Sequence, residues 1–211
     1  SVSIRRRPPS STRFPSSPVL HSRAFYALCT HLDHELRMVS GTLLEEDLLD
    51  DTIIFFAADH GDRLGNHGLW AKRLYYGHSA DVPMILLGGV DGRVGHHAID
   101  DRLVGWQDVM PTLLDLADID IPDSVEGQSM LEEKPRQYLY GECGEGPTAT
   151  RMIREGQFKL IYYPAGNRSQ LFDIENDPRE LHDLAGDKNY AKTLDRLAGH
   201  LKGELYGDDN A

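Results

Sequence analysis

The 211-residue sequence contains only two cysteines, Cys29 and Cys143. They can form one disulfide at most, and a chain of this length can bury a core without one, so free thiols in a reducing compartment are expected. No run approaches the roughly 20 apolar residues that a membrane span requires, and no apolar segment follows the N-terminal arginines as in a signal peptide. These absences predict a cytoplasmic location and no membrane partner.

Positive charge is scarce beyond the N-terminal end of the chain. The formal net charge is -12, and residues 1–23 hold five arginines and no acid, so residues 24–211 carry -17. A nucleic-acid partner needs a basic face to neutralise phosphates, and none is expected here. Residues 1–23 are rich in Ser and Pro and predict a disordered arm. Arg5, Arg6 and Arg7 in that arm are either a binding patch or part of a solvated tail.

Residues 24–135 show the alternation of helix and strand that is typical of an α/β layer. A continuous apolar run at residues 52–58 is typical of a strand buried on both faces in a parallel sheet, and residues 82–87, entered through Pro83, predict a second strand. Residues 106–116 have a helical period. A first helix from Ala24 to about Glu46 is predicted by apolar residues every three or four positions, namely Phe25, Leu28, Leu32, Leu36, Val39 and Leu43.

The pattern changes near residue 137. Strand-like segments at 138–140, 151–154, 158–163 and 170–173 follow one another, with Glu155-Gly156 as a hairpin turn between two of them. A terminal amphipathic helix is expected over residues 190–205. Residues 136–211 therefore predict a small antiparallel sheet with a helix across it, appended to the α/β part.

Asp59 and His60 follow directly on the first predicted strand. Ligands of open α/β sheets gather at the carboxyl ends of strands, and a carboxylate beside an imidazole can face a divalent cation. Two ligands do not by themselves hold a metal, so a solvated loop is the alternative. Lys72, thirteen residues after Asp59, would offer a long cationic arm to a sulfate or phosphate oxyanion near that cation. Taken alone, Lys72 is interpreted first as an ordinary surface lysine.

Residues 59–72 (Asp-His-Gly-Asp-Arg-Leu-Gly-Asn-His-Gly-Leu-Trp-Ala-Lys) resemble the C-terminal signature of the sulfatase family, in the alkaline-phosphatase superfamily, and arylsulfatases of bacterial type most of all. The resemblance extends from Ala24 onward. It includes the segment from Asp108 to Ala117, Gly127 with Ser129, and the close from Gln170 to Glu180, all in family order. It implies a sulfatase-like α/β fold and the hydrolysis of sulfuric esters.

The resemblance implies a role for each residue of the loop. Asp59 and His60 correspond to the second pair of ligands of a divalent metal, usually Ca²⁺, with Mg²⁺ or Mn²⁺ as alternatives. Lys72 corresponds to the lysine that contacts the sulfate. His67 is expected to pack the loop first and to act in the site second. Adjacent histidines at 96 and 97 are expected in a loop rather than in a metal site.

Members of the family use a formylglycine nucleophile made from Cys or Ser in a Cys/Ser-x-Pro-x-Arg motif. Neither Cys29 nor Cys143 has the Pro and Arg of this motif, so no nucleophile is assigned. The sequence is therefore expected to be a fragment that corresponds to the C-terminal portion of a sulfatase and is inactive alone. Gly77, His78 and Asp81 depart from the glutamate and the basic residue that the family usually has, which predicts a Lys72 that is less well braced.

Two other functions stay open at this point. The site would also suit a phosphodiester or phosphonate monoester, because sulfate and phosphate esters share tetrahedral geometry. Alternatively, the chain is a non-catalytic remnant or interaction module that associates through an exposed sheet edge and an apolar helical face. Asp100, Asp101, Glu142 and Glu145 are expected to be solvated acids, although the loops near 141–151 could border a substrate cleft.

Overall fold

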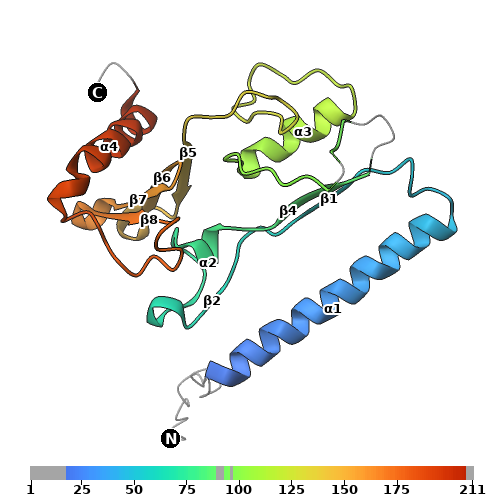
Figure 1. Cartoon of the computed structure of the whole chain (residues 1–211), viewed down its shortest axis with the longest axis horizontal. Coiled ribbons are helices and arrows are strands. Elements are labelled where there is room, and N and C mark those ends of the chain that lie inside the picture. The colour runs from blue at the N-terminus through green and yellow to red at the C-terminus, as the bar shows by residue number, and fades with distance from the viewer. Residues whose placement is uncertain (1–17, 89–92, 96, 208–211) are drawn as a thin grey trace, which may run out of the picture.

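The computed structural model describes residues 18–88, 93–95 and 97–207. Figure 1 shows a long helix at the N-terminal end, a middle part with two strands under a helix, and a C-terminal sheet beside a helix. The helices are α1 (Pro18–Glu45), α2 (Gly77–Ala80), α3 (Val109–Leu116) and α4 (Ala191–Tyr206), and the strands are β1 (Ile54–Ala57), β2 (Arg63–Leu64), β3 (Trp70–Ala71), β4 (Met84–Leu87), β5 (Leu139–Cys143), β6 (Thr150–Glu155), β7 (Phe158–Tyr163) and β8 (Arg168–Asp173).

Helix α1 begins at Pro18, six residues before the predicted start at Ala24. Proline is tolerated in the first helical turn because the amide hydrogen that it lacks has no intrahelical acceptor there. The prediction of a disordered arm over residues 1–23 is therefore wrong for residues 18–23, and residues 1–17, with the three consecutive arginines, lie outside the described part of the chain.

The apolar face predicted for α1 is not covered. No side chain of this helix is buried, and Leu28 and Val39 are 67% and 59% exposed. The helix lies apart from the rest of the described chain along most of its length (Figure 1). Near its N-terminal end, the rings of His21 and Trp70 are in contact, with centroids 5.0 Å apart. Among the described helices, none has the length and apolar character needed to cross a membrane.

Strands β1 and β4 pair in the antiparallel direction, from Ile54 opposite Leu87 to Ala57 opposite Met84. The prediction of a doubly buried strand in a parallel sheet is wrong for this pair, since β1 is only partly buried along its length and its neighbour runs the other way. The intervening chain reverses direction through a small hairpin formed by β2 and β3, with Arg63 opposite Ala71. Residues 59–68, predicted as a loop, therefore contain a short strand.

Helix α3 lies above β1 and β4 in Figure 1. The buried carboxylate of Asp108, just before this helix, connects it by hydrogen bonds to the segment around Gly127. The Asp108 carboxylate is buried and accepts from the amides of Gly105 at 2.8 Å and Gln128 at 2.9 Å. A Cβ on Gly127 would collide with the Gln107 carbonyl oxygen, so only glycine fits there. These contacts explain why the predicted helix and the Gly127 loop occur together.

The C-terminal sheet has the order β5-β6-β7-β8 and is antiparallel throughout, as predicted. Helix α4 packs on one face, where a buried cluster forms. The opposite face carries a second cluster of Ile161 and Phe172 with Tyr76, which immediately precedes α2. The C-terminal sheet is thus packed, on the face away from α4, against the segment that follows the predicted signature loop. The cluster between the sheet and α4 consists of Ile153, Leu160, Leu171, Leu197 and Leu201.

Candidate functional site

Asp59 and His60 lie just beyond the end of β1, as predicted. The His60 Nδ1 atom is 2.8 Å from the carbonyl oxygen of Gly61. Because a carbonyl oxygen only accepts, Nδ1 carries the ring hydrogen and donates it, which leaves a lone pair on Nε2. The Oδ2 atom of Asp59 is 3.2 Å from this Nε2. A carboxylate oxygen and an imidazole lone pair therefore converge at one point.

The ammonium group of Lys72 hydrogen-bonds to His60 Nε2. Three residues of the predicted loop thus meet, although thirteen positions separate Asp59 from Lys72. The Asp59 side chain is 79% exposed and that of His60 is 36% exposed, so the arrangement is open to solvent. The Lys72 ammonium thus lies beside the same imidazole nitrogen that Asp59 approaches.

Arg63 holds the main chain on either side of the lysine. Its Nε donates to the carbonyl oxygen of Ala71 and its Nη2 to that of Lys72, both at 2.8 Å, and the residue is 3% exposed. Arg63 therefore braces the main chain at Lys72. Arg63 was not predicted from the sequence, and the available signal was a second basic residue, besides Lys72, in the segment 59–72.

His67 packs within the loop. Its ring stacks on that of Tyr76, with centroids 4.2 Å apart and an interplanar angle of 19°. It is absent from the residues that line the cavity beside Lys72 in the described structure. This position agrees with the first of its two predicted roles.

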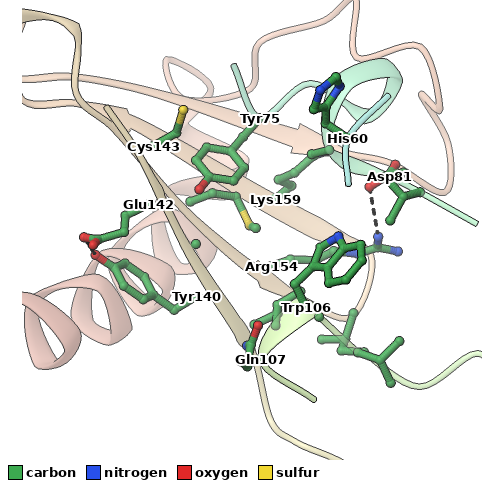
Figure 2. Close-up of a pocket in the computed structure, with 18 of the residues that line it drawn as sticks. His60, Tyr75, Asp81, Trp106, Gln107, Tyr140, Glu142, Cys143, Arg154 and Lys159 are labelled. Carbon is green, nitrogen blue, oxygen red and sulfur yellow. Dashed lines mark hydrogen bonds and ion pairs between the residues drawn. The ribbon is translucent and has the colours of Figure 1, made fainter. Parts of the chain in front are cut away.

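A cavity of about 1080 Å³ opens beside Asp59, His60 and Lys72, between the middle part and the C-terminal sheet. Figure 2 shows aromatic and charged side chains from both parts around it. Trp106 is fixed there because its Nε1 donates to the carbonyl oxygen of Ala58 at 3.1 Å. Of the segment 141–151 predicted to border a cleft, residues 141–143, at the end of β5, line the cavity.

Two tyrosines of the cavity wall are donors at neutral pH. Burial, followed by the hydrogen bond between its hydroxyl and Glu142, raises the pKa of Tyr140 to about 12. Burial is also the largest cause that raises the pKa of Tyr75 above its ordinary value. Tyr75 needs a glycine opposite it, because a Cβ on Gly141 would lie 2.9 Å from its ring. A polar substrate would therefore meet two protonated phenols.

The positions that depart from the family pattern have partners of their own. His78 Nε2 is 3.0 Å from the side-chain nitrogen of Asn66, and Asp81 forms an ion pair with Arg154 at 3.8 Å (Figure 2). The amide of Gly77 donates to Glu180 at 2.6 Å. The segment from Gly77 to Asp81 is thus connected both to the signature loop and to the C-terminal part.

Several predicted candidates lie elsewhere or have other partners. Cys29 and Cys143 are free, as expected. His97 lies in a turn, and His96 falls outside the described residues. Asp100 lines the cavity but pairs with Arg102, whose hydrogen bonds hold the pKa of that carboxyl below its ordinary value. Neither the cysteines nor these residues join the group around His60.

Asp59 and His60 supply two ligands of the shell that a divalent cation requires. Divalent cations with oxygen preference take six or more ligands, and Asp59 with His60 supplies one carboxylate and one imidazole. Over residues 18–88, 93–95 and 97–207, no three His, Cys, Asp or Glu side chains gather in a metal-binding group. The remaining ligands would have to come from groups other than these.

The mixed arrangement of helices and sheets belongs to the alkaline-phosphatase-like fold of the sulfatases. The sulfatase family model matches residues 8–119, and the model described as N-sulphoglucosamine sulphohydrolase, C-terminal, matches residues 65–205. The chain belongs to the sulfatase family.

Individual relatives agree with this assignment. An arylsulfatase of Clostridium perfringens is 37% identical over 196 residues, which cover 87% of this chain and 40% of the relative. A choline-sulfatase of Rhizobium meliloti is 37% identical over 172 residues, which cover 77% of this chain and 33% of the relative. The chain therefore spans about two fifths or less of the length of these relatives.

Solved structures show the same likeness. A putative sulfatase from Bacteroides thetaiotaomicron aligns with a TM-score of 0.67 at 29% identity, covering 76% of this chain and 38% of that one. A phosphonate monoester hydrolase from Silicibacter pomeroyi aligns with a TM-score of 0.72 at 27% identity, covering 82% and 38%. A putative sulfatase and a phosphonate monoester hydrolase therefore both share the fold of this chain.

Proposed function

We propose that this chain supplies one half of the active site of a metal-dependent sulfuric ester hydrolase of arylsulfatase type. The observation that carries the proposal is the convergence of Asp59 Oδ2, His60 Nε2 and the Lys72 ammonium beside a large cavity. Asp59 and His60 are the metal ligands, and Lys72 contacts the sulfate. The family membership and the relatives named above support the reaction class.

The metal is most simply Ca²⁺, with Mg²⁺ or Mn²⁺ as alternatives, because a carboxylate ligand suits all three cations. When bound, such a cation would polarise a sulfate oxygen and share the charge that develops there. Asp59 and His60 would hold the cation, and the Lys72 ammonium beside them would contact the sulfate. The Gly61 carbonyl accepts from His60 Nδ1 and so orients the imidazole.

Turnover also requires a nucleophile. No Cys or Ser in the 211 residues is followed by both Pro two positions on and Arg four positions on, so the formylglycine motif must come from a full-length parent. We propose that the 211-residue protein alone does not hydrolyse sulfate esters.

The test is hydrolysis of an aryl sulfate by the 211-residue protein in the presence of Ca²⁺ or Mn²⁺. The expected result is no turnover above buffer. Clear activity that disappears in Asp59→Ala would contradict the requirement for a separate nucleophile, while leaving the role of Asp59 intact.

A second candidate function is the hydrolysis of a phosphonate monoester or phosphodiester. The specific observation in its favour is the structural likeness to the phosphonate monoester hydrolase. Sulfate and phosphate monoesters differ mainly in charge, and a single lysine beside two metal ligands discriminates between them poorly. Rates of a full-length parent on matched aryl sulfate and phosphonate substrates separate the two functions, and a higher kcat/KM for the sulfate supports the first.

A further inference from the structure

Lys159 on β7 and Glu180, in the turn after β8, form an almost fully buried ion pair. Their side chains are 2% and 1% exposed, and Lys159 Nζ lies 2.6 Å from Glu180 Oε1. Removing two charges from water costs free energy that their attraction does not always offset, and apolar residues of similar volume often stabilise a core as well or better. Stability of the C-terminal core alone therefore gives no reason for charges at these two positions.

The second oxygen of Glu180 connects the pair to another part of the chain. Oε2 accepts the amide hydrogen of Gly77, the first residue of α2, at 2.6 Å. Glu180 has a φ of 54°, in the left-handed region that favours glycine. Its own amide donates to the carbonyl oxygen of Asp177 at 2.9 Å, which holds this conformation. A glutamate side chain is thus kept at a backbone position unfavourable for it and directed at α2.

Helix α2 is in turn joined to the residue beside His60. The amide of Gly61 donates to the carbonyl oxygen of Ser79 at 2.8 Å. A Cβ on Gly61 would collide with the carbonyl oxygen of His78, so the two main chains are as close as they can be. The carbonyl oxygen of Gly61 is the group that accepts from His60 Nδ1.

These contacts form one continuous path. It runs from Lys159 to Glu180, then to the amide of Gly77, through α2 to Ser79, and across to Gly61 and the His60 ring. Figure 2 shows Lys159 and His60 on the same side of the cavity. The parallel tie between Asp81 and Arg154 is longer, at 3.8 Å, and more exposed, so it is the weaker of the two connections.

We propose that Glu180, through the oxygen that accepts the Gly77 amide, is a positioning residue that sets the place of α2 and so the orientation of His60 as a metal ligand. The inference rests on the proposed role of His60. On this proposal the C-terminal part helps to hold the metal ligand in place, because the buried Glu180 carboxylate, in the turn after β8, accepts a hydrogen bond from the first residue of α2.

The test compares two double variants in the 211-residue protein. Lys159→Met with Glu180→Met removes both charges and the acceptor for Gly77, whereas Lys159→Met with Glu180→Gln removes both charges and keeps an acceptor oxygen. Neither variant leaves an unpaired buried charge, which favours folding of both. Amide exchange measured by NMR at Gly77 and Gly61 reports the path, and exchange at Leu160 and Ile161 reports opening of the core.

The expected result is exchange at Gly77 and Gly61 that is faster by about tenfold or more in the Met/Met variant than in the Met/Gln variant, with equal exchange at Leu160 and Ile161. Affinity for Mn²⁺ should fall in the same variant. The inference is overturned if Gly61 exchanges equally in both variants, or if its rate changes only in proportion to that of the core amides.

His60→Ala separates this inference from the proposed function. It should abolish Mn²⁺ binding and leave exchange at Gly77 unchanged. If the wild-type protein and His60→Ala bind Mn²⁺ equally weakly, the proposed metal role of His60 is contradicted, and the exchange rates of the two double variants still decide whether Glu180 positions the loop.

Discussion

Gly61 occupies a position where no side chain fits. Any Cβ would meet the His78 carbonyl oxygen, which belongs to the main chain and cannot turn aside. Gly61→Ala must therefore separate the loop from α2. We expect a loss of stability of about 1–3 kcal/mol, as for other overpacked sites, together with weaker Mn²⁺ binding.

Urea unfolding and Mn²⁺ titration measure these two effects. Gly186→Ala is the matched control, because nothing lies within 4 Å of a Cβ at Gly186. Equal stability and equal Mn²⁺ affinity of Gly61→Ala and the control would show that the close approach of the two main chains is not required.

Lys159 is a second residue at which one change has a large effect. Lys159→Met leaves the Glu180 carboxylate buried, at 1% exposure, without its partner. Loss of one member of such a pair typically costs about 3–5 kcal/mol. The free energy of unfolding in urea should fall by that amount, and the added change Glu180→Met should restore most of it. A single variant as stable as the wild type would mean that the carboxylate has another source of stabilisation.

At the scale of elements, the parts predicted well are those set by local pattern. The hairpin around Glu155-Gly156, helix α4 and helix α3 all follow from periodicity and turn residues that lie within a short segment. The direction in which β1 pairs with β4 depends on a reversal of the chain between them, which the apolar run of residues 52–58 does not encode.

The residues of the candidate site, like the elements, could be predicted from the sequence only where they lie in one local segment. Asp59, His60 and Lys72 could be predicted because they lie in one signature loop, and the structure brings them together. The role of Glu180 could not be predicted. Charged residues are rarely buried, so the sequence pattern indicates that Lys159 and Glu180 lie at the surface. Their pairing joins two elements of the C-terminal part and becomes visible only once the sheet is folded.

The end of β8 makes the C-terminal sheet sensitive to acid. Burial disfavours the charged form of Asp173, but hydrogen bonds from Asn176 and Gln157 outweigh it, so the pKa of Asp173 lies below its ordinary value of 3.8. The stabilisation is thus complete above pH 3.8 and is lost as the pH falls through the lower pKa of the folded state.

The urea midpoint of the wild type should therefore decrease as the pH falls from about 5 to 2.5, and that of Asp173→Asn should decrease less over the same range. Parallel curves for the two proteins would exclude Asp173 as a source of the acid sensitivity.

At the scale of the whole molecule, the described chain exposes surface that soluble domains usually cover. Apolar side chains of α1 face solvent, and β1 and β4 each have one neighbouring strand within the residues that the structure describes. Such surfaces favour association. We expect the 211-residue protein to form oligomers in a concentration-dependent way.

Analytical ultracentrifugation measures this association. Leu28→Lys with Val39→Lys, which places charges on the exposed face of α1, should shift the protein toward monomer, while Leu181→Lys on the C-terminal part is the control for added charge. A wild-type protein that stays monomeric at all accessible concentrations would contradict association through these surfaces.

The central claim is that Asp59 and His60 bind a cation beside the Lys72 ammonium. Calorimetric titration with Mn²⁺ tests it most directly, because three variants have different expected results. Asp59→Ala and His60→Ala should lose binding, and Lys72→Ala should bind severalfold more tightly, since it removes the competing donor to Nε2. Unchanged affinity in Asp59→Ala, or weaker binding in Lys72→Ala, would contradict the account.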